Sequence, residues 1–271
     1  MKRVFVAGLA IFAFSVVSAQ QKEGKVIYQR VSQMQARTFN FNGMTQEIPA
    51  STRTDKFELS FGNNQSMWRQ AEAENDSETS SFGGDGAGFQ MRMVVAGSND
   101  VVYHNFDGAR RVEKREMFDK SFIIDDSIRP LKWKMTGETK TILNHPCMKA
   151  TATSINQRSQ TIMENGKLDR KEISDTSFIE AWFASDIPVS AGPGEFQGQL
   201  PGLILEMNFS NGRQVYTALE ISPKVDLASI KEPSGKKKYT QAEFRKERDK
   251  MMDEMNQNMQ HGSGNRRIIM E

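Results

Sequence analysis

The sequence has little of the chemistry on which most enzymes and metal proteins depend. Its 271 residues include one cysteine, Cys147, and three histidines. One cysteine excludes an internal disulfide, so packing alone must hold the fold. No Gly-x-Ser-x-Gly, His-Glu-x-x-His or Cys-x-x-Cys motif occurs, and neither His104 nor His145 has a recognisable partner for a Ser-His-Asp triad. The sequence therefore predicts no catalytic residue and no cofactor.

An excess of charge of one sign is also missing. The chain has 36 Lys and Arg against 34 Asp and Glu, and two of the basic residues, Lys2 and Arg3, fall in an N-terminal segment without acidic residues. Beyond that segment the two counts are equal. A chain without net charge has no overall field to hold nucleic acid or an anionic membrane. We therefore expect no nucleic-acid partner.

Long apolar runs occur only at the N-terminus. Residues 1–19 begin with two basic residues, continue as an apolar run and end in Val17-Ser18-Ala19, which is the pattern of a secretory signal peptide. No cysteine follows that could carry a lipid anchor, and no later window approaches the roughly 18 apolar residues of a transmembrane helix. We expect a mature chain that begins at Gln20, has no transmembrane segment and lies in the periplasm or at the periphery of the outer membrane.

Short runs in which apolar and polar residues alternate are abundant. Phe57, Leu59 and Phe61 share one face of an expected strand, and Gly62-Asn63-Asn64 can reverse the chain after it. The same alternation predicts strands at Leu131, Trp133 and Met135, and at Ile179, Ala181 and Phe183.

Two dipeptides mark tighter turns. Asn165-Gly166 and Asn211-Gly212 are the pairs that a hairpin prefers, because its central residues need positive φ. Such spacing predicts a mainly β domain over residues 20–222: one large curved antiparallel sheet of about 8–11 strands, half-barrel-like in shape. Within it, residues 70–90 are acidic and rich in Ser and Gly, which favours a disordered loop.

The remaining residues, 223–271, are predicted to form a loop, a helix over 240–259 and a flexible tail. Thr240 and Glu243 have the spacing of a capping box, in which each side chain bonds the other residue's backbone amide. A stripe of Phe244 and methionines follows at helical spacing, so the helix is amphipathic and packs against the sheet or a partner.

One cluster has the chemistry of metal ligands. His145, Cys147 and Met148 carry an imidazole, a thiol and a thioether, which together favour Cu(I). On a strand, however, His145 and Cys147 point to one face and Met148 to the other. Many of the 16 methionines also occupy positions typical of core residues. We predict no metal site, and the alternative is copper handling or an unrecognised enzyme centred on His145 and Cys147.

Three ordered motifs resemble those of the GLPGLI family, a group of exported proteins from Bacteroidetes. They are Cys147–Ala150, Ala181–Pro193 and Gln199–Met207, with Gln199 in place of the first Gly of the family's hexapeptide. The resemblance implies export and an architecture but no established activity, and members of the family are associated with outer-membrane transporters. The motif positions are Cys147, Lys149, Ala150, Pro188, Gly192, Pro193, Leu200, Pro201, Gly202, Leu203 and Ile204.

The motif segment has the features of a rigid crossover. Pro188 and Pro193 cannot donate to a ladder, so the chain must leave the sheet or follow its edge there. The apolar run Leu203–Leu205 indicates a strand that is covered on both faces. One consequence would be a lip over the concave side, in a fold similar to the half-barrels of periplasmic lipoprotein carriers. The residues expected to line an apolar ligand are Trp133, Trp182, Phe183, Leu200 and Leu203.

These features predict a non-enzymatic exported protein that acts as a binding or accessory module of the cell envelope, for which an apolar ligand is one option. Besides the alternative at His145 and Cys147, a structural role is open. The Met-rich helix from Thr240 to Met259 would then dock onto an outer-membrane transporter or another envelope protein.

Overall fold

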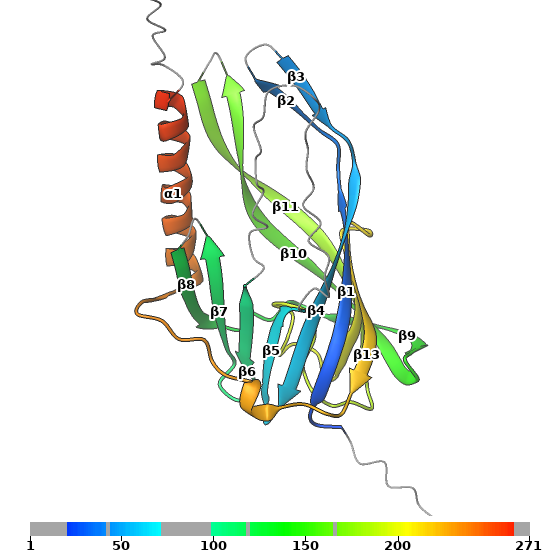
Figure 1. Cartoon of the computed structure of the whole chain (residues 1–271). Helices are drawn as coiled ribbons and strands as arrows, with labels where there is room; N and C mark the ends of the chain where they lie inside the picture. Colours follow the sequence, from blue (N-terminus) through cyan, green and yellow to red (C-terminus); the bar gives the residue numbers. More distant parts are fainter. Residues whose placement is uncertain (1–20, 42–43, 72–98, 118–119, 165–166, 263–271) are drawn as a thin grey trace, which may run out of the picture.

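The structure, a computed structural model, describes residues 21–41, 44–71, 99–117, 120–164 and 167–262. Within them the protein is mainly β, as predicted: twelve strands form one open sheet and two form a separate hairpin (Figure 1). The sheet exceeds the expected strand count and is mixed, because β14 pairs with β8 in parallel. The strands are β1 (Gly24–Met34), β2 (Arg37–Phe41), β3 (Met44–Ile48), β4 (Ser51–Gly62), β5 (Gln65–Gln70), β6 (Val101–Asn105), β7 (Arg110–Met117), β8 (Lys120–Ser127), β9 (Lys134–Ile142), β10 (His145–Glu164), β11 (Lys167–Ala184), β12 (Leu203–Phe209), β13 (Gln214–Ser222) and β14 (Lys238–Tyr239).

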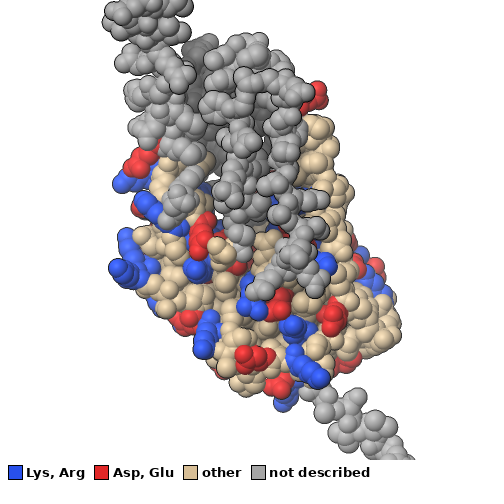
Figure 2. Space-filling view, viewed as in Figure 1, with Lys and Arg blue, Asp and Glu red and all other residues tan. Residues whose placement is uncertain are grey.

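The first strand of the chain lies inside the sheet, between β4 and β13. The order is β14-β8-β7-β6-β5-β4-β1-β13-β12-β11-β10-β9, so β14 and β9 form the two edges. Lys25 near the start of β1 pairs with Ser222 at the end of β13. Acidic and basic side chains are interspersed over the described part of the surface seen in Figure 2.

The Asn-rich turns form as expected. Asn63 and Asn64 have φ of 50° and 56° and join β4 to β5 in a two-residue turn, with Gly62 paired to Gln65. Asn211 and Gly212 have φ of 56° and 89° between β12 and β13. The second turn is wider than a two-residue hairpin, because Phe209 and Gln214 form the last strand pair before it.

One predicted strand is wrong in part. Leu131 and Trp133 precede β9, which begins only at Lys134. The side-chain oxygen of Gln199 accepts hydrogen bonds from the Leu131 amide at 2.9 Å and from the Trp133 ring nitrogen at 3.0 Å. These hydrogen bonds hold Leu131 and Trp133 against the segment before β12. Of the three residues predicted to form a strand, only Met135 lies on β9, where it is 45 % exposed.

The C-terminal residues pack on the sheet at two places. A short 3₁₀ helix, η1 (Leu227–Ser229), and Ile230 cover a cluster on β6, β7 and β8 that includes Tyr103, Val112 and Ile123. On β8, next to the edge strand β14, α1 (Gln241–Gly262) buries Phe244 and Met251 against Phe122 and Ile124. The first three turns of α1 thus contribute to the folded core.

The predicted capping box of α1 is confirmed. The Glu243 carboxylate accepts from the Thr240 amide at 2.7 Å, and the Thr240 hydroxyl oxygen accepts from the Glu243 amide at 3.2 Å. Asp126 of β8 also accepts from the Gln241 amide at 3.2 Å. A carboxylate at this end complements the helix dipole and fixes α1 to the sheet.

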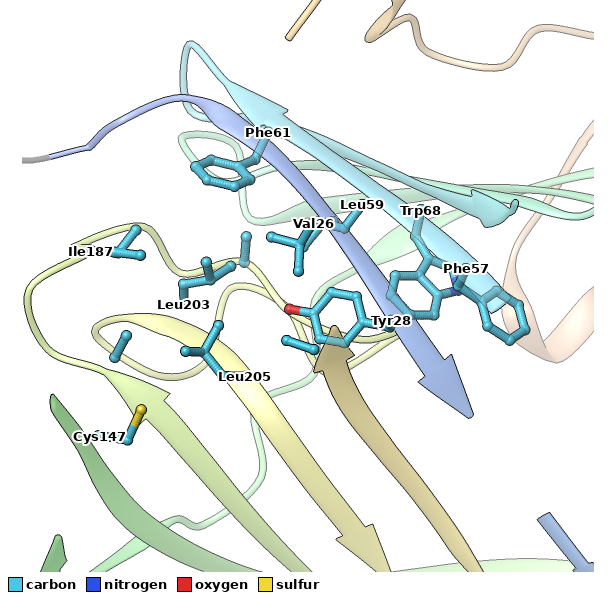
Figure 3. Close-up of a cluster of buried hydrophobic side chains, with 13 residues drawn as sticks. Val26, Tyr28, Phe57, Leu59, Phe61, Trp68, Cys147, Ile187, Leu203 and Leu205 are labelled. Carbon is cyan, nitrogen blue, oxygen red and sulfur yellow. The ribbon is translucent and has the colours of Figure 1, made fainter. Parts of the chain in front are cut away.

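The largest core cluster joins the early strands to the strands around the motifs (Figure 3). Val26, Leu59 and Phe61 pack there with Leu203 and Leu205, all of which are inaccessible to solvent. The Tyr28 hydroxyl points into this cluster and donates to the Ile204 carbonyl at 2.5 Å. The Ile204 carbonyl needs such a donor, because β12 pairs with β13 only from Glu206 onward and a buried carbonyl requires a hydrogen-bond partner.

Several predicted features lie outside the described residues. They are the signal peptide over 1–19, residues 72–90 of the acidic loop, the Asn165-Gly166 turn and the tail beyond residue 262.

Candidate ligand-binding face

Residues 185–202, which we call the crossover segment, join β11 to β12 without forming a strand. The segment leaves the sheet, as Pro188 and Pro193 predict, and crosses one of its faces. Gln197 accepts a 2.5 Å hydrogen bond from Ser66 on β5, and Glu195 forms a 3.1 Å ion pair with Arg111 on β7. We call the covered side of the sheet its inner face.

Two glycines explain how tightly the crossover segment packs. A Cβ on Gly192 would lie 2.8 Å from Ile204, and a Cβ on Gly202 would lie too close to the Ala184 carbonyl oxygen. Backbone bonds then fix the segment beside β12: the Leu203 amide donates to Ile187 at 3.1 Å and the Ile204 amide to Ala191 at 3.0 Å. Leu203, Ile204 and Leu205 are at most 1 % exposed, as expected for a strand covered on both faces.

A row of aromatic side chains follows the inner face from the crossover segment to β4 and β5. The rings of Phe196 and Phe209 are 4.8 Å apart, those of Phe209 and Tyr216 are 6.0 Å apart, and Tyr216 lies 5.9 Å from Trp68, edge to face. Phe57 stacks on Trp68 at 4.9 Å. Phe57 and Trp68 are buried, whereas the other three are half-buried. We call these five residues the aromatic row.

A charged cluster lies at the β1 and β4 end of the aromatic row. Asp55 is 8 % exposed and accepts from Arg30 through one carboxylate oxygen, at 2.7 Å, and from Arg53 through the other, at 2.8 Å. The Arg30 guanidinium is 4.6 Å from the centre of the Phe57 ring, and Arg30 pairs with Tyr216 across the strands. Burial raises the pKa of Tyr216, although the charge of Arg30 opposes this.

The structure brings together three of the five residues predicted to line a ligand. Phe183 and Leu200 are buried in one cluster, and Trp133 packs against it from a half-buried position. The same cluster contacts Phe196, Phe209 and Tyr216, so it adjoins the aromatic row.

The other two predicted residues lie elsewhere. Trp182 pairs with Lys149 on β10 and with Glu206 on β12, and its side chain lies on the side of β11 opposite to Phe183. The Lys140 ammonium lies 4.3 Å from the centre of its ring. Leu203 belongs to the cluster of Figure 3, which also contains Phe57 and Trp68 of the aromatic row and against which Trp182 packs. Trp182 and Phe183 point to opposite faces because they are consecutive residues of a strand. A β-bulge between them also shifts the register with β12.

The remaining motif residues pack rather than converge on a site. Ala150 is fully buried, and Lys149 forms a 2.8 Å ion pair with Glu180. Gly192 and Pro193 are also buried, whereas Pro188 and Pro201 are exposed. The motif thus lies on the crossover segment, on β12 and on β10, which pairs with β11.

The cluster of His145 and Cys147 is spread over two environments. His145 Nδ1 lies 2.8 Å from the Asp186 carboxylate, whereas the Cys147 thiol is buried and donates to the His145 carbonyl at 3.4 Å. Burial raises the pKa of the Cys147 thiol to about 11, which disfavours the thiolate that metals bind. Within the described ranges, no group of three or more His, Cys, Asp or Glu side chains could hold a metal ion.

A buried polar cluster under the crossover segment was not predicted. Ser66, His104 and Arg111 are direct neighbours across β5, β6 and β7, and Gln197 lies on Ser66. His104 is fully buried, and neither ring nitrogen has a hydrogen-bond partner among the described residues. Burial and then the charge of Arg111 lower the pKa of His104 from 6.5 to about 3, so the ring is neutral near pH 7.

Glu113 balances the charge of this cluster. It is 1 % exposed and lies 2.8 Å from Arg111 and 2.7 Å from Arg115.

One signal in the sequence could have indicated the buried charged residues, namely a charged residue within an apolar alternation. Arg30 continues the alternating series of Val26 and Tyr28, and Asp55 precedes the series of Phe57 and Leu59.

Comparison with known proteins adds a family match over part of the chain. A family model described as "Protein of unknown function (Porph_ging)" matches residues 133–206, which cover β9 to the first half of β12 with the crossover segment. The match does not carry the GLPGLI name, so membership of that family stays a prediction. No curated protein matches the chain.

A solved structure described as "Structure of PNGF-II in C2 space group" is similar at a TM-score of 0.49 and 16 % sequence identity. The alignment covers 83 % of this chain and 32 % of that chain, so this chain spans about a third of the other's length. In the described part of this chain, no helix combines the length and the hydrophobicity needed to cross a bilayer.

Proposed function

We propose that the chain is an exported binding protein of the cell envelope, and that it holds a ligand with an apolar part on the inner face of its sheet. The observation that supports this most directly is the aromatic row. Aromatic side chains contribute large contact areas, and three of these five stay half-buried beside a rigid crossover. Export and the envelope location are supported by the signal-like residues 1–19 and by the resemblance to GLPGLI proteins.

The first test is native mass spectrometry with solvent extraction of the protein, purified gently from its own host. A reproducible extra mass on the chain beginning at Gln20, soluble in organic solvent, would support the proposal. A bare chain that also fails to bind an uncharged apolar probe in vitro would overturn it.

A matched pair of variants locates the binding. Phe209→Ser removes a half-buried ring of the aromatic row, whereas Phe178→Ser removes a ring that is 42 % exposed on the other side of neighbouring β11. Binding of N-phenyl-1-naphthylamine should weaken roughly tenfold in the first variant, because burial of such a ring contributes about 1.5 kcal/mol or more. The second variant should bind as wild type does; equal losses in both would place the ligand elsewhere.

The two alternatives need separate tests. If the protein handles copper, Cu(I) titration against a chromophoric competitor should show retained metal, and Cys147→Ser should abolish the retention. For docking through α1, Met252→Glu is a sharper test than deletion, because Met252 is 39 % exposed while Phe244 and Met251 are core residues. The variant should lose an envelope partner on co-purification and stay folded.

A further inference from the structure

The charged cluster beside the aromatic row is not electrically neutral. Two guanidinium groups, those of Arg30 and Arg53, share the single carboxylate of Asp55. The three side chains together keep one positive charge. The Arg30 and Arg53 side chains are 25 % and 39 % exposed, whereas the Asp55 side chain is 5 % exposed. The outer surface of the cluster is therefore cationic, and its anionic member lies beneath.

The hydrogen bonds also leave donors available. Asp55 engages Nε and Nη2 of both arginines, and Arg30 also hydrogen-bonds the Tyr216 side chain, so the free donors lie mainly on Arg53. Each guanidinium carries five N–H donors in a planar fork that suits a carboxylate. Among the described residues, Arg53 has no second acidic partner. Glu195 is another acidic residue near this cluster, since its charge raises the pKa of Tyr216. Glu195, however, forms its ion pair with Arg111.

The cluster is continuous with the apolar surface. The Arg30 guanidinium packs over Phe57, which stacks on Trp68, and Tyr216 connects these rings to Phe209. A molecule lying along the row would thus have its apolar part on aromatic rings and one end beside Arg30 and Arg53. Charge complementarity requires that end to be an anion.

We propose that the Arg30–Asp55–Arg53 cluster binds the anionic head group of a single-chain amphiphile, of the fatty-acid type, whose apolar chain lies along the aromatic row. This inference rests on the proposed function and specifies the class of its ligand. The carboxylate of the ligand accepts hydrogen bonds from the free edges of the two guanidinium groups, while Asp55 keeps both side chains in place.

The test measures displacement of bound N-phenyl-1-naphthylamine by three twelve-carbon compounds: dodecanoate, dodecan-1-ol and dodecylammonium. All are used below their aggregation concentrations, at pH 7.5 and low salt. Dodecanoate should bind roughly tenfold more tightly than dodecanol, since a charge-assisted pair contributes well beyond a neutral contact. Dodecylammonium should bind most weakly, and added salt should reduce the preference for dodecanoate.

Variants of the cluster should move only the anion. Arg53→Gln should weaken dodecanoate binding roughly tenfold and leave dodecanol unchanged, and Arg53→Lys should restore part of the loss. Asp55→Asn should strengthen dodecanoate binding, because it removes a negative charge that lies beside the anion and repels it. Arg69→Gln is the matched control: Arg69 is an exposed arginine of β5 that pairs with Glu58 instead.

The outcomes separate the two proposals. If the probe and all three compounds fail to bind, the proposed function fails and this inference with it. If dodecanol and dodecanoate bind equally, or if Arg53→Gln and Arg69→Gln have the same effect, the apolar face stands and the anion site is refuted. Because the Arg53 side chain is 39 % exposed and the Asp55 side chain 5 %, the Arg53 variant tests the site even if Asp55→Asn does not fold.

Discussion

Acid should destabilise the fold through His104, and the effect should begin near pH 6.5. In the unfolded chain the imidazole takes up a proton near pH 6.5, whereas in the folded protein its pKa is lowered to about 3 by burial and by the charge of Arg111. Between these values the unfolded state binds more protons. The free energy of unfolding is therefore fully maintained above about pH 6.5 and falls as the pH falls toward 3.

The size of the effect follows from the same two values. Each pH unit inside the window corresponds to about 1.4 kcal/mol, so the free energy of unfolding should fall by roughly 2 kcal/mol between pH 6.5 and 4.5. Below this range, carboxylates with a lowered pKa contribute a loss of the same sign. Asp125 is an example, because its hydrogen bond with Arg110 lowers its pKa to about 2. The interval from pH 6.5 to 4.5 therefore isolates the histidine.

Urea unfolding at pH 7.5, 6.5, 5.5 and 4.5, followed by tryptophan fluorescence, measures this dependence. His104→Gln should flatten the curve over the window, whatever its own stability. His145→Gln is the control, because it removes a partly exposed histidine and leaves the buried cluster intact. A wild-type protein whose stability does not change between pH 6.5 and 4.5 would refute the reasoning, as would an unchanged slope in His104→Gln.

Three further predictions concern the packing around the motifs. Tyr28→Phe should lower the free energy of unfolding by roughly 1–3 kcal/mol, because it leaves the buried Ile204 carbonyl without its donor; a loss below about 0.5 kcal/mol in urea unfolding would contradict this. Gln199→Gly should release the Trp133 ring nitrogen and shift tryptophan emission to longer wavelength, whereas an unshifted spectrum would show that Gln199 does not hold the ring. Cys147 should react with a thiol reagent at pH 8 only as fast as the protein unfolds, because burial raises the pKa of its thiol to about 11; rapid labelling of the native protein would contradict this.

The alternation of side chains was enough to predict the mainly β fold and much of its core. Phe57, Leu59 and Phe61 share a buried face because a strand repeats every two residues. The same rule failed at Leu131 and Trp133, whose place depends on the hydrogen bonds that they donate to a residue far along the chain, Gln199. A local pattern contains no information about such a partner.

The candidate site was predictable only in its motif half. Pro188 and Gly192 indicate a crossover because the missing N–H of proline and the missing side chain of glycine are local properties of the sequence. The sheet order decides what the crossover covers, and so brings Gln197 onto Ser66. Arg30 and Asp55 also meet only because β1 pairs with β4 in one register. The sequence shows that Arg30 and Asp55 interrupt an apolar alternation with a charge. It does not show which residue pairs with each of them.

The position of β1 between β4 and β13 has a consequence for how the protein is made. The strand at the middle of the sheet is synthesised first, but its second neighbour comes late, since Lys25 pairs with Ser222. Until β13 is available, β1 keeps an open edge, and open edges recruit other chains. Contacts between such distant parts of a chain also form slowly. A nascent or shortened chain that ends before Gln214 is therefore the form most exposed to aggregation, and it is the form on which a chaperone would act.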